Sequence, residues 1–522
     1  MKVALFGYSG FVGSNILQFY KIDEFYNSKN ITSAINKNFD VVYFCGIPAN
    51  KWHANKYSQE DLDIIESIKN ILKTINVKKF ILISTIDVYE DVDLCYNEDY
   101  DCDYFINHPY GRNRYIFEYF IKSHFKDYNI IRLPALFGKG LKKNLLYDLI
   151  HNNQIDKIVI NSMFQWYDLN WLKNDIEIII KNDIKICNLF TEPLQTIEII
   201  KLFDYNHSIF NNSSKIVYNT KTKYSHLFNC SIDGYVRDKT IVLNNIIEFL
   251  KFQKIDKSNL VVSNICIKTI SQFQFSCILK LFGIKYVQIA PTTMIDDWCN
   301  LKNMNINIFK NNEIDIYSFQ SILYGLNNLN IFDETTTDLL FEHFKNVIDY
   351  GINNNIKVFV FGCPKNRYIL NTDSESNDEI FCKFFKKLGE YIGDNDLKIC
   401  IEPNSKIYGC NYINTIKQAG NIVRKINNNN IKLMLDIGNI IMENDNINDI
   451  IDYVDILYNI DISTKNIDPL IEISKSHKEF MQVIQNINYK YKLNLEMIIK
   501  NDSDELDLLF RSLNNLIFYI EK

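Results

Sequence analysis

Four acidic residues in the second half of the chain share one setting, because each ends a short apolar run. They are Glu402, Asp436, Asp461 and Glu496. If these runs are consecutive strands of one barrel, the carboxylates converge on a single point, where their repulsion is costly unless a cation joins them. Carboxylate oxygens suit Mg²⁺ or Mn²⁺ better than Zn²⁺. The pattern predicts a divalent metal site; the alternative for any one residue is a solvated carboxylate.

A glycine-rich turn lies close to the first residue of the chain. Gly7, Gly10 and Gly13 follow an apolar run and open a helical pattern with the spacing G-x-x-G-x-x-G. Glycines allow a tight turn and let the backbone approach a diphosphate, and the start of the helix offers unpaired N–H donors. We therefore expect Gly7, Gly10, Phe11, Val12 and Gly13 to bind a dinucleotide. The alternative is an ordinary turn between a strand and a helix.

Two later segments extend this pattern. Residues 83–89 read Ile-Ser-Thr-Ile-Asp-Val-Tyr, and residues 109–114 read Pro-Tyr-Gly-Arg-Asn-Arg. With the glycine turn they resemble the S-S-x-x-V-Y and P-Y-x-x-x-K segments of the NAD-dependent epimerase/dehydratase family, the extended short-chain dehydrogenases. Residues 132–138 and 164–194 contain segments similar to later parts of that family, so the resemblance covers most of residues 1–215.

This resemblance implies NAD or NADP as cofactor and gives roles to three side chains. Thr85 supplies the hydroxyl and Tyr110 the phenol that flank the reacting carbinol, and a lysine of the family lowers the pKa of the phenol. Arg114 stands at the lysine position; a guanidinium can stabilise a phenolate, but it is planar and bulkier. The alternative for Tyr110 is a partly buried helix tyrosine. Residues 27–29, Asn-Ser-Lys, suit a ribose hydroxyl or a phosphate, so NAD and NADP both stay open.

The acidic residues of the second half belong to a wider resemblance. Residues 360–367 and 402–410 are similar to the sugar phosphate isomerase/epimerase family of xylose isomerase-like barrels, and the likeness spans nearly all of residues 258–500. It implies that the four carboxylates hold the metal. It also implies that Glu402 and Glu496 exchange a proton with the carbon beside a carbonyl that the metal polarises.

Some positions depart from that family or stay ambiguous. The departures are Asp461 and Asn439 where histidines are common, and Gln288 where a glutamate often ends the second strand. Lys365 and Arg367 suit a phosphate or carboxylate at the barrel rim, and the alternative is a surface salt bridge. We expect His477 to be a surface residue of a helix and not a ligand.

The elements that must position these residues are short apolar strands alternating with helical patterns, which predict α/β folds. In residues 1–255 they predict a Rossmann-type, doubly wound parallel sheet. In residues 258–522 eight strand-like runs predict a (β/α)8 TIM barrel. The runs are 260–264, 286–290, 314–318, 358–361, 398–402, 432–436, 456–461 and 494–497. A polar stretch at 251–258 separates the two domains.

Composition narrows the partners and the compartment. The net charge of −6, without a Lys/Arg block, argues against nucleic acid as a partner. The twelve cysteines form no C-x-x-C pair and predict reduced thiols. No apolar run reaches the length of a membrane span, so we expect a cytoplasmic protein without membrane contact. A homodimer is compatible with this class.

We therefore expect a bifunctional enzyme of sugar metabolism. The first domain would carry out nicotinamide-dependent epimerase, dehydratase or reductase chemistry on a sugar or nucleotide-sugar, and the second a metal-assisted isomerisation or epimerisation. The alternative is a catalytically degenerate protein that binds NAD or a sugar, because both sites carry substitutions. A nuclease ranks third: the endonuclease with this barrel needs many histidines at strand ends, and this half has only His343 and His477.

Overall fold

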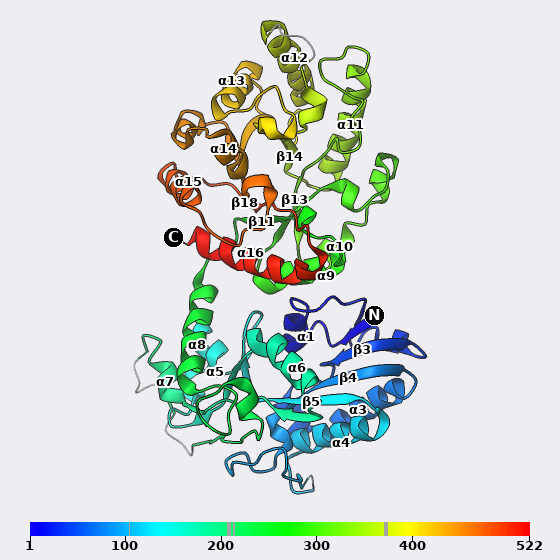
Figure 1. The fold of residues 1–522 in the computed structure, drawn as a ribbon, viewed down its shortest axis with the longest axis vertical. Coiled ribbons are helices and arrows are strands. Elements are labelled where there is room, and N and C mark those ends of the chain that lie inside the picture. Colours follow the sequence, from blue (N-terminus) through cyan, green and yellow to red (C-terminus); the bar gives the residue numbers. More distant parts are fainter. Residues whose placement is uncertain (104, 206–209, 212–214, 370–373, 522) are drawn as a thin grey trace. The chain divides into compact units, whose positions relative to one another are not determined.

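The chain divides into two compact units, Met1–Lys254 and Ile255–Lys522. A computed structural model describes residues 1–103, 105–205, 210–211, 215–369 and 374–521 (Figure 1). The polar stretch expected at 251–258 is shorter than the sequence suggests. Its first four residues form the last turn of a helix, α8 (Lys239–Lys254).

A parallel sheet with the strand order β2-β1-β3-β4-β5-β9 forms the centre of the N-terminal unit. Its strands are β1 (Val3–Phe6), β2 (Glu24–Tyr26), β3 (Asn38–Phe44), β4 (Asn76–Thr85), β5 (Tyr128–Leu133) and β9 (Ile186–Asn188). Figure 1 shows α3 and α4 along one face of this sheet and α6 on the other. The helices joining the strands are α1 (Phe11–Ile16), α2 (Lys51–Lys56), α3 (Ser58–Leu72), α4 (Pro109–His124) and α6 (Leu172–Lys181). The doubly wound, Rossmann-type prediction is confirmed.

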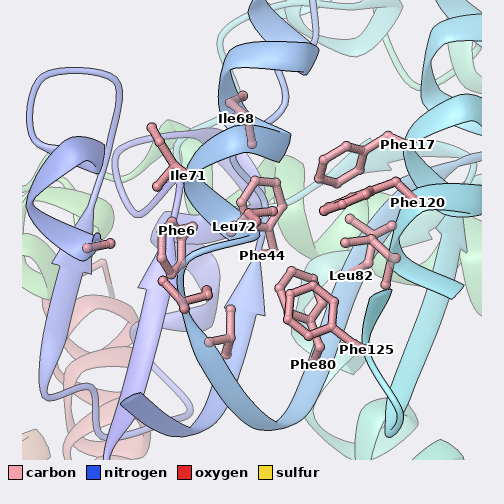
Figure 2. Packing of buried hydrophobic residues seen from close by; sticks show 14 of the residues in the cluster. Phe6, Phe44, Ile68, Ile71, Leu72, Phe80, Leu82, Phe117, Phe120 and Phe125 are labelled. Atoms are coloured by element: carbon pink, nitrogen blue, oxygen red, sulfur yellow. The ribbon is translucent and has the colours of Figure 1, made fainter. Parts of the chain in front are cut away.

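Aromatic side chains fill the space between this sheet and α3 and α4. Phe6, Phe44 and Phe80 come from three neighbouring strands, and their rings stack at centroid distances of 5.5 and 5.8 Å. Figure 2 shows the helix residues around them: Ile68, Ile71, Leu72, Phe117 and Phe120. Burial of each such side chain stabilises the fold by roughly 1.5–3 kcal/mol. The cluster thereby fixes the strands whose ends carry the glycine turn and Thr85.

Beyond β5 the N-terminal unit adds smaller elements. A parallel pair joins β6 (Ala135–Phe137) to β8 (Trp166–Asp168), and an antiparallel pair joins β7 (Met163–Phe164) to β10 (Leu194–Gln195). Two further helices, α5 (Leu145–His151) and α7 (Thr196–Ile200), pack with α8 around a second core.

The C-terminal unit is a closed parallel barrel whose strands follow one another in chain order. They are β11 (Leu260–Ser263), β12 (Tyr286–Ile289), β13 (Asp315–Phe319), β14 (Val358–Phe361), β15 (Lys398–Ile401), β16 (Ile431–Asp436), β17 (Leu457–Ile462) and β18 (Leu493–Leu495). The ring closes where β11 pairs with β18, with Val261 opposite Asn494. Each of the eight predicted runs overlaps one of these strands, which confirms the TIM barrel.

Helices surround the barrel between successive strands, as Figure 1 shows. They are α9 (Gln272–Phe282), α10 (Asn307–Lys310), α11 (Thr337–Asn353), α12 (Ser374–Ile392), α13 (Ile416–Ile426), α14 (Ile437–Glu443), α15 (Lys475–Asn486) and α16 (Glu505–Ile520). Val261, Val358, Val360, Cys400 and Met434 contribute to the packed barrel interior. Within the described residues no helix is long and apolar enough to cross a membrane. All twelve cysteines are free thiols.

Candidate functional site

A cavity of about 930 Å³ lies at the ends of β1, β3 and β4 in the N-terminal unit. Four of the five predicted dinucleotide residues line it, namely Gly7, Gly10, Phe11 and Val12. Its volume falls in the range of small-molecule and cofactor sites, about 300–1,000 Å³. The structure thus brings the glycine turn to a cavity of cofactor size.

The glycines are required by close backbone contacts. Gly7 has φ +85°, and a Cβ there would lie 2.4 Å from the carbonyl oxygen of Cys45. Gly13 lies behind the turn instead of lining the cavity, and a Cβ there would lie 2.1 Å from the Gly7 carbonyl oxygen. Gly10 precedes α1 and donates its N–H to the same oxygen at 2.9 Å. This backbone cradle, open to the cavity, fits the diphosphate of a dinucleotide.

Thr85 and Tyr110 meet in the same cavity from two different elements. Thr85 is the last residue of β4, and Tyr110 lies in the first turn of α4, where its N–H donates to Asn55 Oδ1 at 2.9 Å. Burial raises the pKa of the Tyr110 phenol, while the charge of Arg114 and a hydrogen bond with Thr85 oppose that rise. Tyr110 is therefore a protonated phenol at neutral pH, placed beside a hydroxyl.

Arg114 is held by a partner that sequence reasoning missed. Its guanidinium carbon lies 3.9 Å from the centroid of the Tyr110 ring, so the cation stacks on the phenol face. Its two terminal nitrogens donate to the Asp61 carboxylate of α3, one of them at 3.0 Å, and one also donates to the Pro48 carbonyl. Both side chains are 5% exposed. The expected cation is present beside Tyr110, but the buried Asp61 carboxylate balances its positive charge.

A second charged group borders Thr85. Asp87, two residues after Thr85, accepts hydrogen bonds from Lys51 Nζ at 2.7 Å and from the Tyr218 hydroxyl at 3.1 Å. Burial opposes the charge of Lys51, but Asp87 and Tyr218 raise its pKa above the ordinary value. Lys51 also lines the cavity. The sequence could have indicated Lys51 as a cavity residue only by its position shortly after a predicted strand.

The four predicted carboxylates of the barrel come together at the ends of β15 to β18. Asp436 ends β16 directly opposite Asp461 of β17, while Glu402 and Glu496 follow β15 and β18. Burial raises the pKa of Asp436 to about 6, and burial with the charge of Asp436 raises that of Asp461 to about 7. Burial and the other carboxylates raise the pKa of Glu402 and Glu496 well above the ordinary value.

Amide and hydroxyl groups separate these carboxylates. Asn439 Nδ2 donates to Glu402 Oε1 at 3.0 Å and to Asp436 Oδ2 at 2.9 Å, and the Ser463 hydroxyl donates to Asp436. No group of three or more His, Cys, Asp or Glu side chains is arranged to hold an ion anywhere in the described ranges. The donor set itself, all oxygen and mutually repelling, fits a hard divalent cation by its chemistry.

Arg367 and His477 differ from their predictions because both are buried. Arg367 is fully buried, and its Nη2 donates to the Glu402 carbonyl and to Asn404 Oδ1, each at 2.8 Å. It forms no salt bridge with any described residue. Arg367 therefore neither lies at the barrel rim nor forms a surface ion pair. His477 is 3% exposed in α15, and its Nε2 lies 3.0 Å from the Ser463 carbonyl. Lys365 is exposed, as a rim residue would be.

Two family models match the chain. The NAD dependent epimerase/dehydratase family matches residues 3–169, and the xylose isomerase-like TIM barrel matches residues 279–508. The chain carries one domain of each family. Both are enzyme families, and this epimerase/dehydratase–barrel fusion is an enzyme of sugar metabolism. The epimerase/dehydratase match ends at Leu169 and so includes Thr85, Tyr110 and Arg114, and the barrel match includes all four carboxylates.

Several solved structures resemble about half of the chain. D-psicose 3-epimerase in the presence of D-fructose is 13% identical, with a TM-score of 0.41, covering 50% of this chain and 97% of that one. The 3-keto-D-glucoside 4-epimerase of E. coli is 12% identical, with a TM-score of 0.41, covering 51% and 100%. An AP endonuclease of family 2 from Brucella melitensis is 11% identical, with a TM-score of 0.41, covering 51% and 98%. No curated protein matches the chain.

Proposed function

We propose that the fusion is a bifunctional enzyme whose two sites act on related sugars. Residues 1–255 would carry out nicotinamide-dependent epimerase, dehydratase or reductase chemistry on a sugar or nucleotide-sugar. Residues 258–522 would isomerise or epimerise a sugar with the help of a divalent metal. The observation that carries the first activity is a single cavity lined by the glycine turn, Thr85 and Tyr110.

In the N-terminal cavity the chain's own residues would bind, orient and move a proton. Gly7 and Gly10 would receive the diphosphate, and the bound nicotinamide would supply or accept the hydride. The Thr85 hydroxyl would hold the carbinol oxygen of the sugar, and the Tyr110 phenol would give or take the proton at that oxygen. Arg114, stacked on the ring, would stabilise the phenolate that forms after proton donation.

Tyr110→Phe tests this assignment. It removes the phenol oxygen and leaves the ring for Arg114 to stack on, so hydride transfer should be lost while dinucleotide affinity changes little. The assay follows nicotinamide absorbance with a panel of nucleotide-sugars, and calorimetry measures the affinity. Tyr119→Phe, on the exposed face of the same helix, is the matched control. Retained turnover in Tyr110→Phe contradicts the role, and so does a large loss of affinity without loss of turnover.

In the barrel, Glu402, Asp436, Asp461 and Glu496 would hold Mg²⁺ or Mn²⁺, which supplies Lewis-acid polarisation of a carbonyl when bound. Glu402 and Glu496 would move a proton to and from the carbon beside that carbonyl. Arg367 supports this by fixing the Glu402 main chain. Two buried polar groups near the site, Arg367 Nη1 and the Tyr408 hydroxyl, have no hydrogen-bond partner among the described residues. They could bind the hydroxyl groups of a polyhydroxylated substrate.

Glu402→Gln tests the barrel assignment with two readouts. The metal content after dialysis should fall, as measured by inductively coupled plasma mass spectrometry. Exchange of the substrate C–H hydrogen with deuterated water should stop, as followed by proton NMR on a panel of ketoses. Glu390→Gln, exposed on α12, is the control and should change neither. Unchanged metal content in Glu402→Gln removes this residue from the proposed metal shell.

A catalytically degenerate binding protein is the second candidate. The observation that favours it is the Asp61–Arg114 pair, because a compensated guanidinium serves the phenol less well than a free lysine would. Tight dinucleotide binding without hydride transfer to any tested sugar would support this candidate over the enzyme.

A further inference from the structure

We infer that the N-terminal cavity prefers NADP(H) to NAD(H), and that Ser28 and Lys29 bind the 2′-phosphate. The inference rests on the proposed dinucleotide site and names the cofactor that this site takes. It concerns the loop of residues 27–30 between β2 and the short helical turn Ile31–Ala34.

The end of the second strand is where dinucleotide folds distinguish the two cofactors. An acidic side chain there accepts hydrogen bonds from the ribose hydroxyls and repels a 2′-phosphate, whereas a basic group nearby accommodates the phosphate. In this protein β2 ends at Tyr26, and the next two residues, Asn27 and Ser28, line the cavity. Lys29 follows them, and Ser28 and Lys29 are both exposed.

The two carboxylates near β2 have other partners. Asp23 Oδ2 accepts the N–H of Val3 at 2.7 Å, at the opposite end of the strand. Glu24 forms salt bridges with Lys2 at 2.6 Å and Lys37 at 2.7 Å, and it accepts a hydrogen bond from the Tyr26 hydroxyl. Neither lines the cavity. No carboxylate at the end of β2 is therefore placed to read the ribose hydroxyls.

The charge around the whole cavity agrees with an additional phosphate. Its lining, within the part of the chain described, contains no aspartate or glutamate but three cations, Lys51, Arg114 and Lys143. This contrasts with the net charge of −6 of the protein. Arg114 is paired with Asp61 and Lys51 with Asp87, so Lys143 is the lining cation whose charge no described carboxylate balances. Net positive charge at a cavity favours the more highly charged of two otherwise identical ligands.

The loop that carries Ser28 and Lys29 is already ordered by its own hydrogen bonds. Asn27 Oδ1 accepts the N–H of Lys29 at 2.9 Å, and Asn30 Oδ1 accepts the N–H of Asn27 at 2.7 Å. Asn27 Nδ2 donates to the Tyr8 hydroxyl at 3.0 Å and so ties the loop to the glycine turn. A preformed loop loses little conformational entropy when a ligand binds, so its contacts contribute more fully to affinity.

Titration of the full chain with NADPH and with NADH tests the inference. Trp52 lines the cavity, so quenching of tryptophan fluorescence reports binding without any turnover. We expect NADPH to bind at least about tenfold more tightly than NADH, as a charge-assisted phosphate contact provides. Lys29→Ala should weaken NADPH several-fold and leave NADH within about twofold, because NADH carries a neutral hydroxyl in place of the 2′-phosphate. Ser28→Asp should also weaken NADPH several-fold, because its carboxylate repels the phosphate, and it should leave NADH unchanged or bound more tightly, because the carboxylate can accept a hydrogen bond from the ribose hydroxyl.

Lys21→Ala, an exposed lysine outside the cavity lining, is the matched control and should change neither affinity. If NADH binds as tightly as NADPH, or if Lys29→Ala and Ser28→Asp leave NADPH binding intact, the inference is overturned while the dinucleotide site stands. If neither cofactor binds at millimolar concentration, both the inference and the proposed nicotinamide-dependent function are refuted.

Discussion

Replacing Asp61 with asparagine tests the ion pair that holds Arg114 against Tyr110. The Asp61 carboxylate accepts two N–H groups from Arg114 and one from Asn113 Nδ2 at 2.8 Å, and it is 5% exposed. Asp61→Asn preserves the shape but removes the charge and places an NH₂ group against the guanidinium. Loss of one partner of a buried ion pair costs about 3–5 kcal/mol, because the remaining charge stays desolvated. We expect the N-terminal unit to lose that much stability.

Urea unfolding followed by tryptophan fluorescence measures this loss. Trp52, Trp166 and Trp171 all lie in the N-terminal unit, so they report its transition more strongly than that of the barrel. Asp63→Asn makes the same chemical change at an exposed position of the same helix, and it should shift the free energy of unfolding by less than about 0.5 kcal/mol. If the two variants unfold at the same urea concentration, the pair does not stabilise the unit and the account of Arg114 is refuted.

Two further substitutions test the glycine turn and the electrostatics of β2. Gly13→Ala places a Cβ 2.1 Å from the Gly7 carbonyl oxygen, so calorimetry should find dinucleotide binding lost, whereas Ser14→Ala should retain it. Partial burial opposes the charge of Glu24, but hydrogen bonds from Lys2 and Lys37 lower its pKa from 4.5 to about 2 in the folded chain. The ionised Glu24 therefore stabilises the folded chain above pH 4.5, and this stabilisation is lost as the pH falls towards 2. Glu24→Gln should therefore lower the melting temperature at pH 7, and the difference from the wild type should shrink below pH 4.5; a constant difference across this range contradicts the argument.

The parts of the sites that are local in sequence could be predicted from it. The glycine turn directly follows β1, and each barrel carboxylate lies within one residue of the end of a strand, so strand periodicity alone places them at one edge. The partners that tune these residues come from distant segments. Asp61 is 53 residues from Arg114, and Tyr218 is 131 residues from Asp87.

Burial of single polar residues was the other feature that the sequence did not reveal. His477 was expected on a helix surface, but α15 turns this residue inward, where its ring nitrogens face Ser474 and the Ser463 carbonyl. Arg367 follows β14 in a short helical turn that carries its side chain under Glu402, not to the rim. Periodicity specified neither the inward orientation of α15 at His477 nor the turn that buries Arg367.

Native mass spectrometry of the full chain, with NADPH and Mn²⁺ added, tests most directly whether each unit has its own ligand site. The wild type should carry a dinucleotide adduct and a manganese adduct together. Gly13→Ala should lose only the dinucleotide, and Asp436→Asn should lose only the manganese. If Asp436→Asn retains the manganese adduct, or if the wild type takes up neither ligand, the account of two separate sites is wrong.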